Sequence, residues 1–110
     1  MTHSAEQAAV ASVALWIVHT VDCAAYARRT LTGPPTSAKE PGPANAAETK
    51  MVYDYACALT ERLHERAKHW GLTVSEIDAG RDFVQHMPWP LMIADYPQAL
   101  SVVGGRLSPA

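Results

Sequence analysis

The stretch AAVASVALWIVHTVDCAAYA, residues 8–27, decides the fold of this chain. It is long and apolar, and its strongly polar members are Ser12, His19, Thr20 and Asp22. In a chain of 110 residues, a helix this apolar must lie against other helices, against another subunit or in lipid. The stretch therefore predicts either the central helix of a bundle or a helix that also forms an interface.

One narrow stripe of this predicted helix is polar. At about 100° per residue, five polar side chains share one side of the helix: Ser12, His19, Asp22, Tyr26 and Arg29. We expect that side to face solvent. The apolar arc around the rest of the helix is wider than a single packed neighbour covers. We therefore predict that the helix mediates self-association, as in a homodimer, through an interface formed by Val10, Val13, Trp16, Ile17 and Val21.

A membrane span is the less favoured interpretation of the same stretch. Roughly twenty apolar residues are long enough to cross a bilayer, but an acidic residue near mid-span, such as Asp22, costs about 2.5–3.5 kcal/mol. Glu6 precedes the apolar run and no Lys or Arg does, which is untypical of a secretory signal. Cys23 and Cys57, both within predicted helices, suit a reducing compartment. We expect a cytoplasmic protein without a membrane span.

Length and composition favour one helical domain over residues 1–110. The chain is 48% hydrophobic, enough for a core of ordinary size. Its net charge of -2 and pI near 6.2 give no overall basic footprint for nucleic acid.

Helix start and stop signals predict an all-α fold. The capping-box pattern occurs at Ser4 with Gln7, at Asn45 with Glu48 and at Thr73 with Glu76. We predict a small helical bundle in which a long antiparallel hairpin, residues 5–31 and 46–70, is followed by two shorter helices, residues 74–86 and 96–103. Asp95 is expected to cap the last of these, with Pro97 in its first turn. Residues 32–44, rich in Pro and Gly, are predicted to be a linker, and residues 104–110 a flexible tail.

The sharpest candidate for chemistry is the run from Arg81 through Asp82 to His86. It resembles the R-[polar]-x3-H signature of the HEPN superfamily of helical ribonuclease and nucleotide-binding domains, over six residues of 110. The resemblance implies an RNA-cleaving site at a dimer interface, where Arg81 steadies a phosphate and His86 assists proton transfer. The structural alternative is that Arg81 and Asp82 are exposed and that His86 closes the end of its helix.

Metal binding has weaker support. Glu61 and His64 have the i, i+3 spacing of di-iron helices, but the second pair that such a site needs is absent, because His19 and Asp22 occur in reversed order. We expect Glu61 and His64 to be solvated, and His19 and Asp22 to be a local hydrogen-bonded pair at a subunit or helix seam. We predict no metal ion and no cofactor.

The aromatic and Met-rich segment after residue 87 has two interpretations. Trp89, Met92 and Tyr96 either form an interaction surface or cover the open end of the bundle. The function that we expect is a non-enzymatic helical interaction module, a small cytoplasmic regulator, inhibitor or adaptor that binds a protein partner and self-associates through its first helix. The alternative is a HEPN-like ribonuclease that uses Arg81 and His86.

Overall fold

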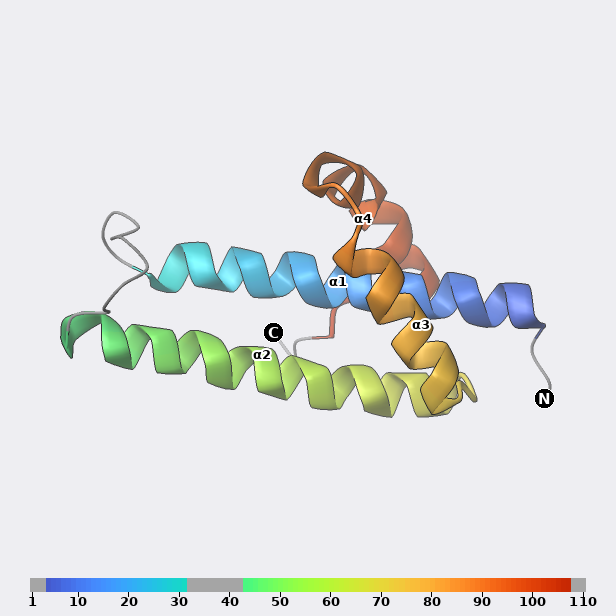
Figure 1. Ribbon diagram of the computed structural model, residues 1–110, viewed down its shortest axis with the longest axis horizontal. Coiled ribbons are helices and arrows are strands. Elements are labelled where there is room, and N and C mark those ends of the chain that lie inside the picture. Colours follow the sequence, from blue (N-terminus) through green and yellow to red (C-terminus); the bar gives the residue numbers. More distant parts are fainter. Residues whose placement is uncertain (1–3, 32–42, 108–110) are drawn as a thin grey trace.

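The long apolar helix α1 (Ala5–Thr30) runs through the middle of the molecule and packs against the three other helices. In this computed structural model, which describes residues 4–31 and 43–107, the others are α2 (Pro43–His69), α3 (Val74–Gln85) and α4 (Trp89–Val103). Figure 1 shows α2 antiparallel to α1, with α3 crossing the pair and α4 on the other side of α1. The predicted all-α bundle built on a long antiparallel hairpin is confirmed.

Two of the predicted capping boxes are present. The Ser4 hydroxyl accepts a hydrogen bond from the Gln7 amide at 3.1 Å and the Gln7 side chain accepts one from the Ser4 amide. Thr73 and Glu76 form the same pair at the start of α3. The third prediction is wrong, because α2 begins at Pro43 and Asn45 lies inside it. Proline is favoured in a first turn since it has no amide proton to leave unpaired. The predicted linker thus ends before Pro43, and residues 32–42 of it lie outside the described residues.

The last helix is longer than predicted. It begins at Trp89 instead of residue 96, with Pro88 at its N-cap and Pro90 in its first turn, where proline is tolerated. Asp95 therefore does not cap the helix, and Pro97 lies in its interior, where it removes one backbone hydrogen bond. The packing of this apolar helix on α1 outweighs the lost backbone hydrogen bond. The sequence pattern alone does not reveal this tertiary packing.

The prediction of a flexible tail over residues 104–110 is corrected for residues 104–107, and residues 108–110 of it lie outside the described residues. After Gly104, which ends α4 in a left-handed conformation, the chain turns back and buries Leu107 in the core at 2% exposure. The Arg66 guanidinium of α2 donates a hydrogen bond to the Val103 carbonyl at 2.9 Å and holds the end of α4. Residues 104–107 are thus part of the packed fold.

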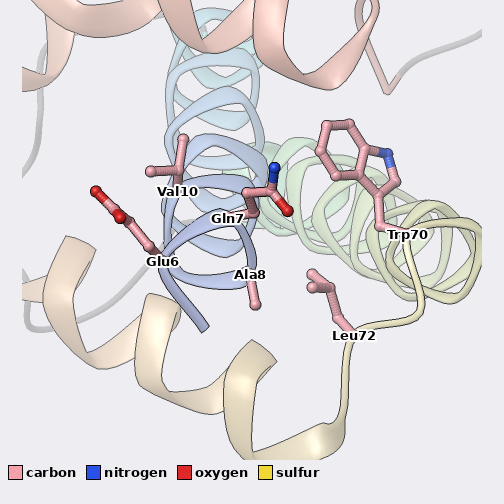
Figure 2. Close-up of a pocket in the computed structure, with 6 residues that line it drawn as sticks. All are labelled: Glu6, Gln7, Ala8, Val10, Trp70 and Leu72. Carbon is pink, nitrogen blue, oxygen red and sulfur yellow. The ribbon is translucent and has the colours of Figure 1, made fainter. Parts of the chain in front are cut away.

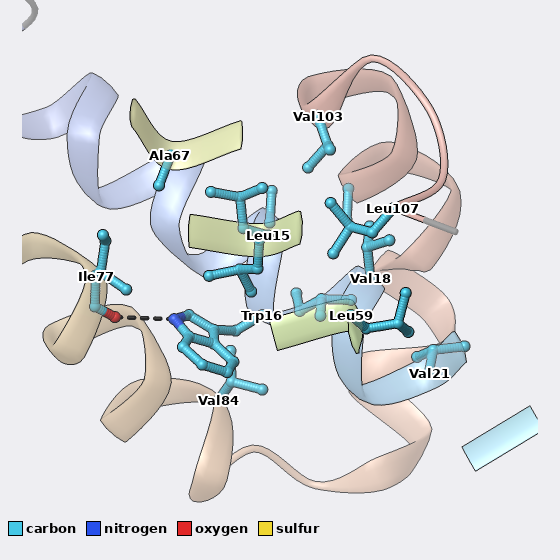
Figure 3. Close-up of a cluster of buried hydrophobic side chains, with 14 of the residues drawn as sticks. Leu15, Trp16, Val18, Val21, Leu59, Ala67, Ile77, Val84, Val103 and Leu107 are labelled. Atoms are coloured by element: carbon cyan, nitrogen blue, oxygen red, sulfur yellow. Dashed lines mark hydrogen bonds between the residues drawn. The ribbon is translucent and has the colours of Figure 1, made fainter. Parts of the chain in front are cut away.

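The core surrounds α1, as Figure 3 shows for the side chains gathered around Leu15 and Trp16. The polar stripe of α1 is largely covered, although Arg29 near its C-terminal end is exposed. Ser12 and Asp22 are buried, and Tyr26 stacks on Tyr55 of α2 with ring centroids 3.9 Å apart. The wide apolar arc is covered mainly within the chain. By length and composition alone α1 could cross a bilayer, a test that core helices of soluble proteins also pass.

Candidate functional site: an apolar groove between α1, α3 and α4

The position of α3 is fixed by a close crossing over α1. The Ser12 hydroxyl of α1 donates to the Glu76 carbonyl at 2.7 Å, and the Trp16 indole donates to the Ile77 carbonyl at 2.9 Å, as Figure 3 shows for the latter. Gly80 permits this approach, because a Cβ added there would lie 2.7 Å from the Ser12 Cβ. One face of α3 is therefore held on the N-terminal half of α1.

The position of α4 is fixed by a buried polar contact. The Tyr96 hydroxyl donates to Asp22 Oδ1 of α1 at 2.5 Å, and the Arg106 guanidinium lies 3.6 Å from the same oxygen. Burial, together with the hydrogen bond to Asp22 and its negative charge, raises the pKa of Tyr96 to about 12, which keeps the hydroxyl a donor. Among the described residues, no donor reaches Asp22 Oδ2.

Between these helices lies a groove of about 390 Å³, which we call the α1/α3/α4 groove. Its α1 wall carries Val10, Val13 and Ile17, at the i, i+3, i+7 spacing of one helix face. Phe83 projects from α3, and the α4 wall presents Asp95, Gln98, Ala99 and Val102. Val10 and Phe83 are 52% and 60% exposed, so the groove has accessible apolar sides. It can hold a row of apolar side chains.

A second hollow, of about 490 Å³, lies beside the N-terminal end of α1. Its lining includes Glu6, Gln7, Val10, Trp70 and Leu72. In Figure 2, Gln7 points toward the Trp70 indole, whereas Glu6 and Val10 project from another side of α1. Because Val10 also lines the α1/α3/α4 groove, the two hollows are neighbours.

The structure separates the predicted interface residues of α1 into two groups. Val10, Val13 and Ile17 line the groove, although Ile17 is itself buried. Trp16 and Val21 lie in the core and present little surface to a second molecule.

The residues of the aromatic and Met-rich segment after residue 87 also fall into a covered group and an exposed one. Met92 is buried in the core and Tyr96 is held by Asp22, as expected of residues that cover the bundle. Trp89 is exposed, and the Arg28 guanidinium lies 5.7 Å from the centre of its ring.

Sequence reasoning missed Phe83, Asp95 and the other residues of the α3 and α4 walls. Phe83 and the buried Val84 are adjacent in the helical pattern of α3, and periodicity gives no sign of which one faces outward. Three residues of the α4 wall, Gln98, Ala99 and Val102, lie within the helix predicted over residues 96–103, but periodicity does not show that they face α1. The α1 wall was found because its apolar spacing is continuous.

Arg81 and His86 do not converge within the chain. Arg81 lies on α3 and His86 is the C-cap residue that ends it, so the two side chains are held separately by their own helix end. The Arg81 guanidinium lies 3.7 Å from Asp78 of its own helix, and His86 Nδ1 donates to the Asp82 carbonyl at 2.8 Å. Both side chains are exposed at the end of α3.

The histidines of the hairpin contact backbone and hydroxyl groups. The prediction of a His19–Asp22 hydrogen bond is wrong, since His19 Nε2 lies 2.9 Å from Thr60 Oγ1 of α2. The Thr60 hydroxyl donates to the Ala56 carbonyl, so it accepts its bond from His19. Burial lowers the pKa of His19, which favours the neutral ring.

Glu61 and His64, which have the spacing of di-iron helices, were expected to be solvated, and both are exposed. His64, on the exposed face of α2, bonds to the Thr60 carbonyl of its own helix. Within residues 4–31 and 43–107, no group of three His, Cys, Asp or Glu side chains is arranged to hold a metal ion.

Comparisons of the chain with protein-family models, with curated proteins and with solved structures find no match. The interpretation of the groove is therefore drawn from its own geometry and chemistry.

Proposed function

We propose that this chain is a small non-enzymatic interaction module that binds an α-helix of a protein partner in the α1/α3/α4 groove. The observation that supports the proposal is the groove itself, an apolar channel with the exposed side chains of Val10 and Phe83 at its sides. Proteins that recognise helices use grooves of this kind, which take apolar residues at i, i+3, i+4 and i+7 of the bound helix. The setting that we propose is a cytoplasmic regulator, inhibitor or adaptor.

The dimensions of the groove suit a short helical segment. From Val10 to Ile17 the α1 wall rises about 10 Å, which corresponds to two helical turns. A partner helix lying along this wall would place two or three apolar side chains in the groove. Both supporting helices are anchored to α1 by buried or partly buried hydrogen bonds, from Ser12 and Trp16 to α3 and from Tyr96 to Asp22. Little rearrangement is then needed, which favours affinity.

Peptide binding tests this proposal. The probe is a fluorescent 18-residue amphipathic peptide with leucines on one helical stripe and glutamines elsewhere, and the measurement is fluorescence anisotropy. We expect Val10→Asp and Phe83→Asp to weaken binding at least tenfold, because each places a charge against apolar side chains.

The controls are Met51→Asp and Tyr53→Asp on α2. Met51 and Tyr53 are 51% and 67% exposed, close to the values of 52% for Val10 and 60% for Phe83. These variants should bind the peptide as the parent chain does, and circular dichroism checks that all four fold. Absence of binding to the parent chain, or equal losses in the groove and control variants, would overturn the proposal.

Self-association through α1 stays a prediction and would need the same groove. Trp16 and Val21, part of the interface expected from the sequence, are already covered within the chain. Light scattering over a wide concentration range shows whether a second copy of the chain occupies the groove. A constant mass near 11.9 kDa would mean that the chain is a monomer, with its groove open to a partner. A doubled mass that Val10→Asp returns to 11.9 kDa, and Met51→Asp does not, would put a second copy there instead.

A further inference from the structure

The ionisable side chains around the α1/α3/α4 groove are acidic. Asp95 lines the groove and Glu6 lines the neighbouring hollow, and no Lys or Arg is among the described residues that line either one. Asp95 is the only charged residue of α4, and Asp82 adjoins Phe83 on α3. The cation of α3, Arg81, lies 3.7 Å from Asp78. A negative potential is expected over the groove.

Asp95 lines the groove, and Glu6 lies outside its lining, in the hollow that adjoins it at Val10. Glu6 stands one helical turn before Val10, on the same side of α1, as Figure 2 shows. It therefore extends the Val10–Val13–Ile17 wall at its N-terminal end.

Contacts of α4 place Asp95 at the other end. Trp89 lies beside Arg28 and Tyr96 is bonded to Asp22, so α4 starts near the C-terminal half of α1. Asp95, next to Tyr96, then lies toward the Ile17 end of the groove. From Glu6 to Ile17 the rise along α1 is about 16 Å.

This arrangement disfavours a second copy as the occupant. A two-fold dimer brings the same patch of both subunits together. Contact through the groove would bring both copies of Asp95 and Glu6 into one interface, and like charges that face each other across an interface are destabilising.

We propose that the partner is a basic amphipathic helix. Its apolar stripe lies on Val10, Val13 and Phe83, and a Lys or Arg at each end of the stripe, about 11 residues apart, pairs with Glu6 and with Asp95. The inference rests on the proposed function, since it specifies the helix that the groove accepts. Apolar contact supplies the affinity, and the two carboxylates select the partner by charge.

Three peptides test the charge preference. They share the leucine stripe of the neutral probe and carry Lys, Gln or Glu at the two flanking positions, 11 residues apart. At low salt we expect the Lys peptide to bind about fivefold tighter than the Gln peptide and the Glu peptide about fivefold weaker, as two exposed charge pairs allow. In 1 M salt the three affinities should approach one another.

Matched variants locate the effect. Glu6→Gln and Asp95→Asn should each reduce the preference for the Lys peptide by about twofold, whereas Glu61→Gln, an exposed carboxylate on α2, should leave it unchanged. Asp95→Lys should make the chain prefer Glu over Lys at the peptide position that faces residue 95.

Failure of this inference is distinct from failure of the proposed function. Equal binding of the three peptides at low salt, still abolished by Val10→Asp, would overturn the charge selection and leave the groove as a helix site. A preference for Lys that Glu61→Gln removes and Asp95→Asn does not would overturn the assignment of the carboxylates. Absence of binding by all three would overturn both proposals.

Discussion

Replacing Gly80 by alanine should destabilise the protein, although alanine is the better helix former. Helix propensity alone gives Gly80→Ala a gain of about 1 kcal/mol. The added Cβ would, however, lie 2.7 Å from the Cβ and 2.8 Å from the backbone carbonyl carbon of Ser12, so α3 must move away from α1. Overpacking costs about 1–3 kcal/mol, and weakening the bonds of Ser12 and Trp16 to α3 costs about 1 kcal/mol each. The net loss is about 2–4 kcal/mol.

Urea denaturation followed by circular dichroism measures this loss as a change in the free energy of unfolding. The control is Ala79→Gly, at the exposed neighbouring position of α3, which should cost about 1 kcal/mol through helix propensity alone. A Gly80→Ala variant that is more stable than the parent chain would refute the close crossing of α1 and α3. The orientation of Phe83 and the shape of the groove depend on this crossing.

Three further predictions concern the tail, the thiols and the ribonuclease alternative. Leu107→Ala should lower the free energy of unfolding by about 2–5 kcal/mol in the same assay, because the side chain is 2% exposed; a change below about 0.5 kcal/mol would restore the flexible tail. With a thiol reagent at pH 8, the exposed Cys57 should react quickly and Cys23 slowly, since burial, aided by the charge of Asp22, raises the pKa of Cys23 to about 11. The Cys23 rate should rise as the pH approaches 11, and equal rates at pH 8 would count against its burial. If Arg81 and His86 form a HEPN-like site, the purified chain should cleave RNA and Arg81→Ala or His86→Ala should abolish the cleavage; cleavage that survives both variants, or none by the parent chain, removes that alternative.

The sequence predicted the helices best where the local signals were complete. The Ser4 and Thr73 capping boxes set the starts of α1 and α3, because a cap is a local hydrogen-bonded motif that needs no tertiary partner. The start of α4 was misplaced because Pro88 and Pro90 suggest turns and Pro97 is typical of a first helical turn. Burial of Met92, Ala99 and Val103 against the bundle outweighs the lost backbone bond.

The polar stripe of α1 shows a second limit of sequence reasoning. Residues of mixed polarity were expected to face solvent, yet Ser12 and Asp22 are buried. Each has a partner on a helix distant in sequence, the Glu76 carbonyl for Ser12 and the Tyr96 hydroxyl for Asp22. A buried polar group is stable when such a partner exists, and periodicity along one helix does not reveal it. Periodicity likewise predicted only the α1 wall of the groove, because the α3 and α4 walls depend on how distant helices pack.

The most direct test of the groove is nuclear magnetic resonance of the isotope-labelled chain during titration with the Lys-flanked peptide. Amide chemical shifts report which residues the peptide contacts. We expect the largest changes at Val10, Phe83 and Val102, with little change at Met51 or Tyr53. Changes centred on Met51 and Tyr53, or none at the three groove residues at saturating peptide, would contradict this expectation.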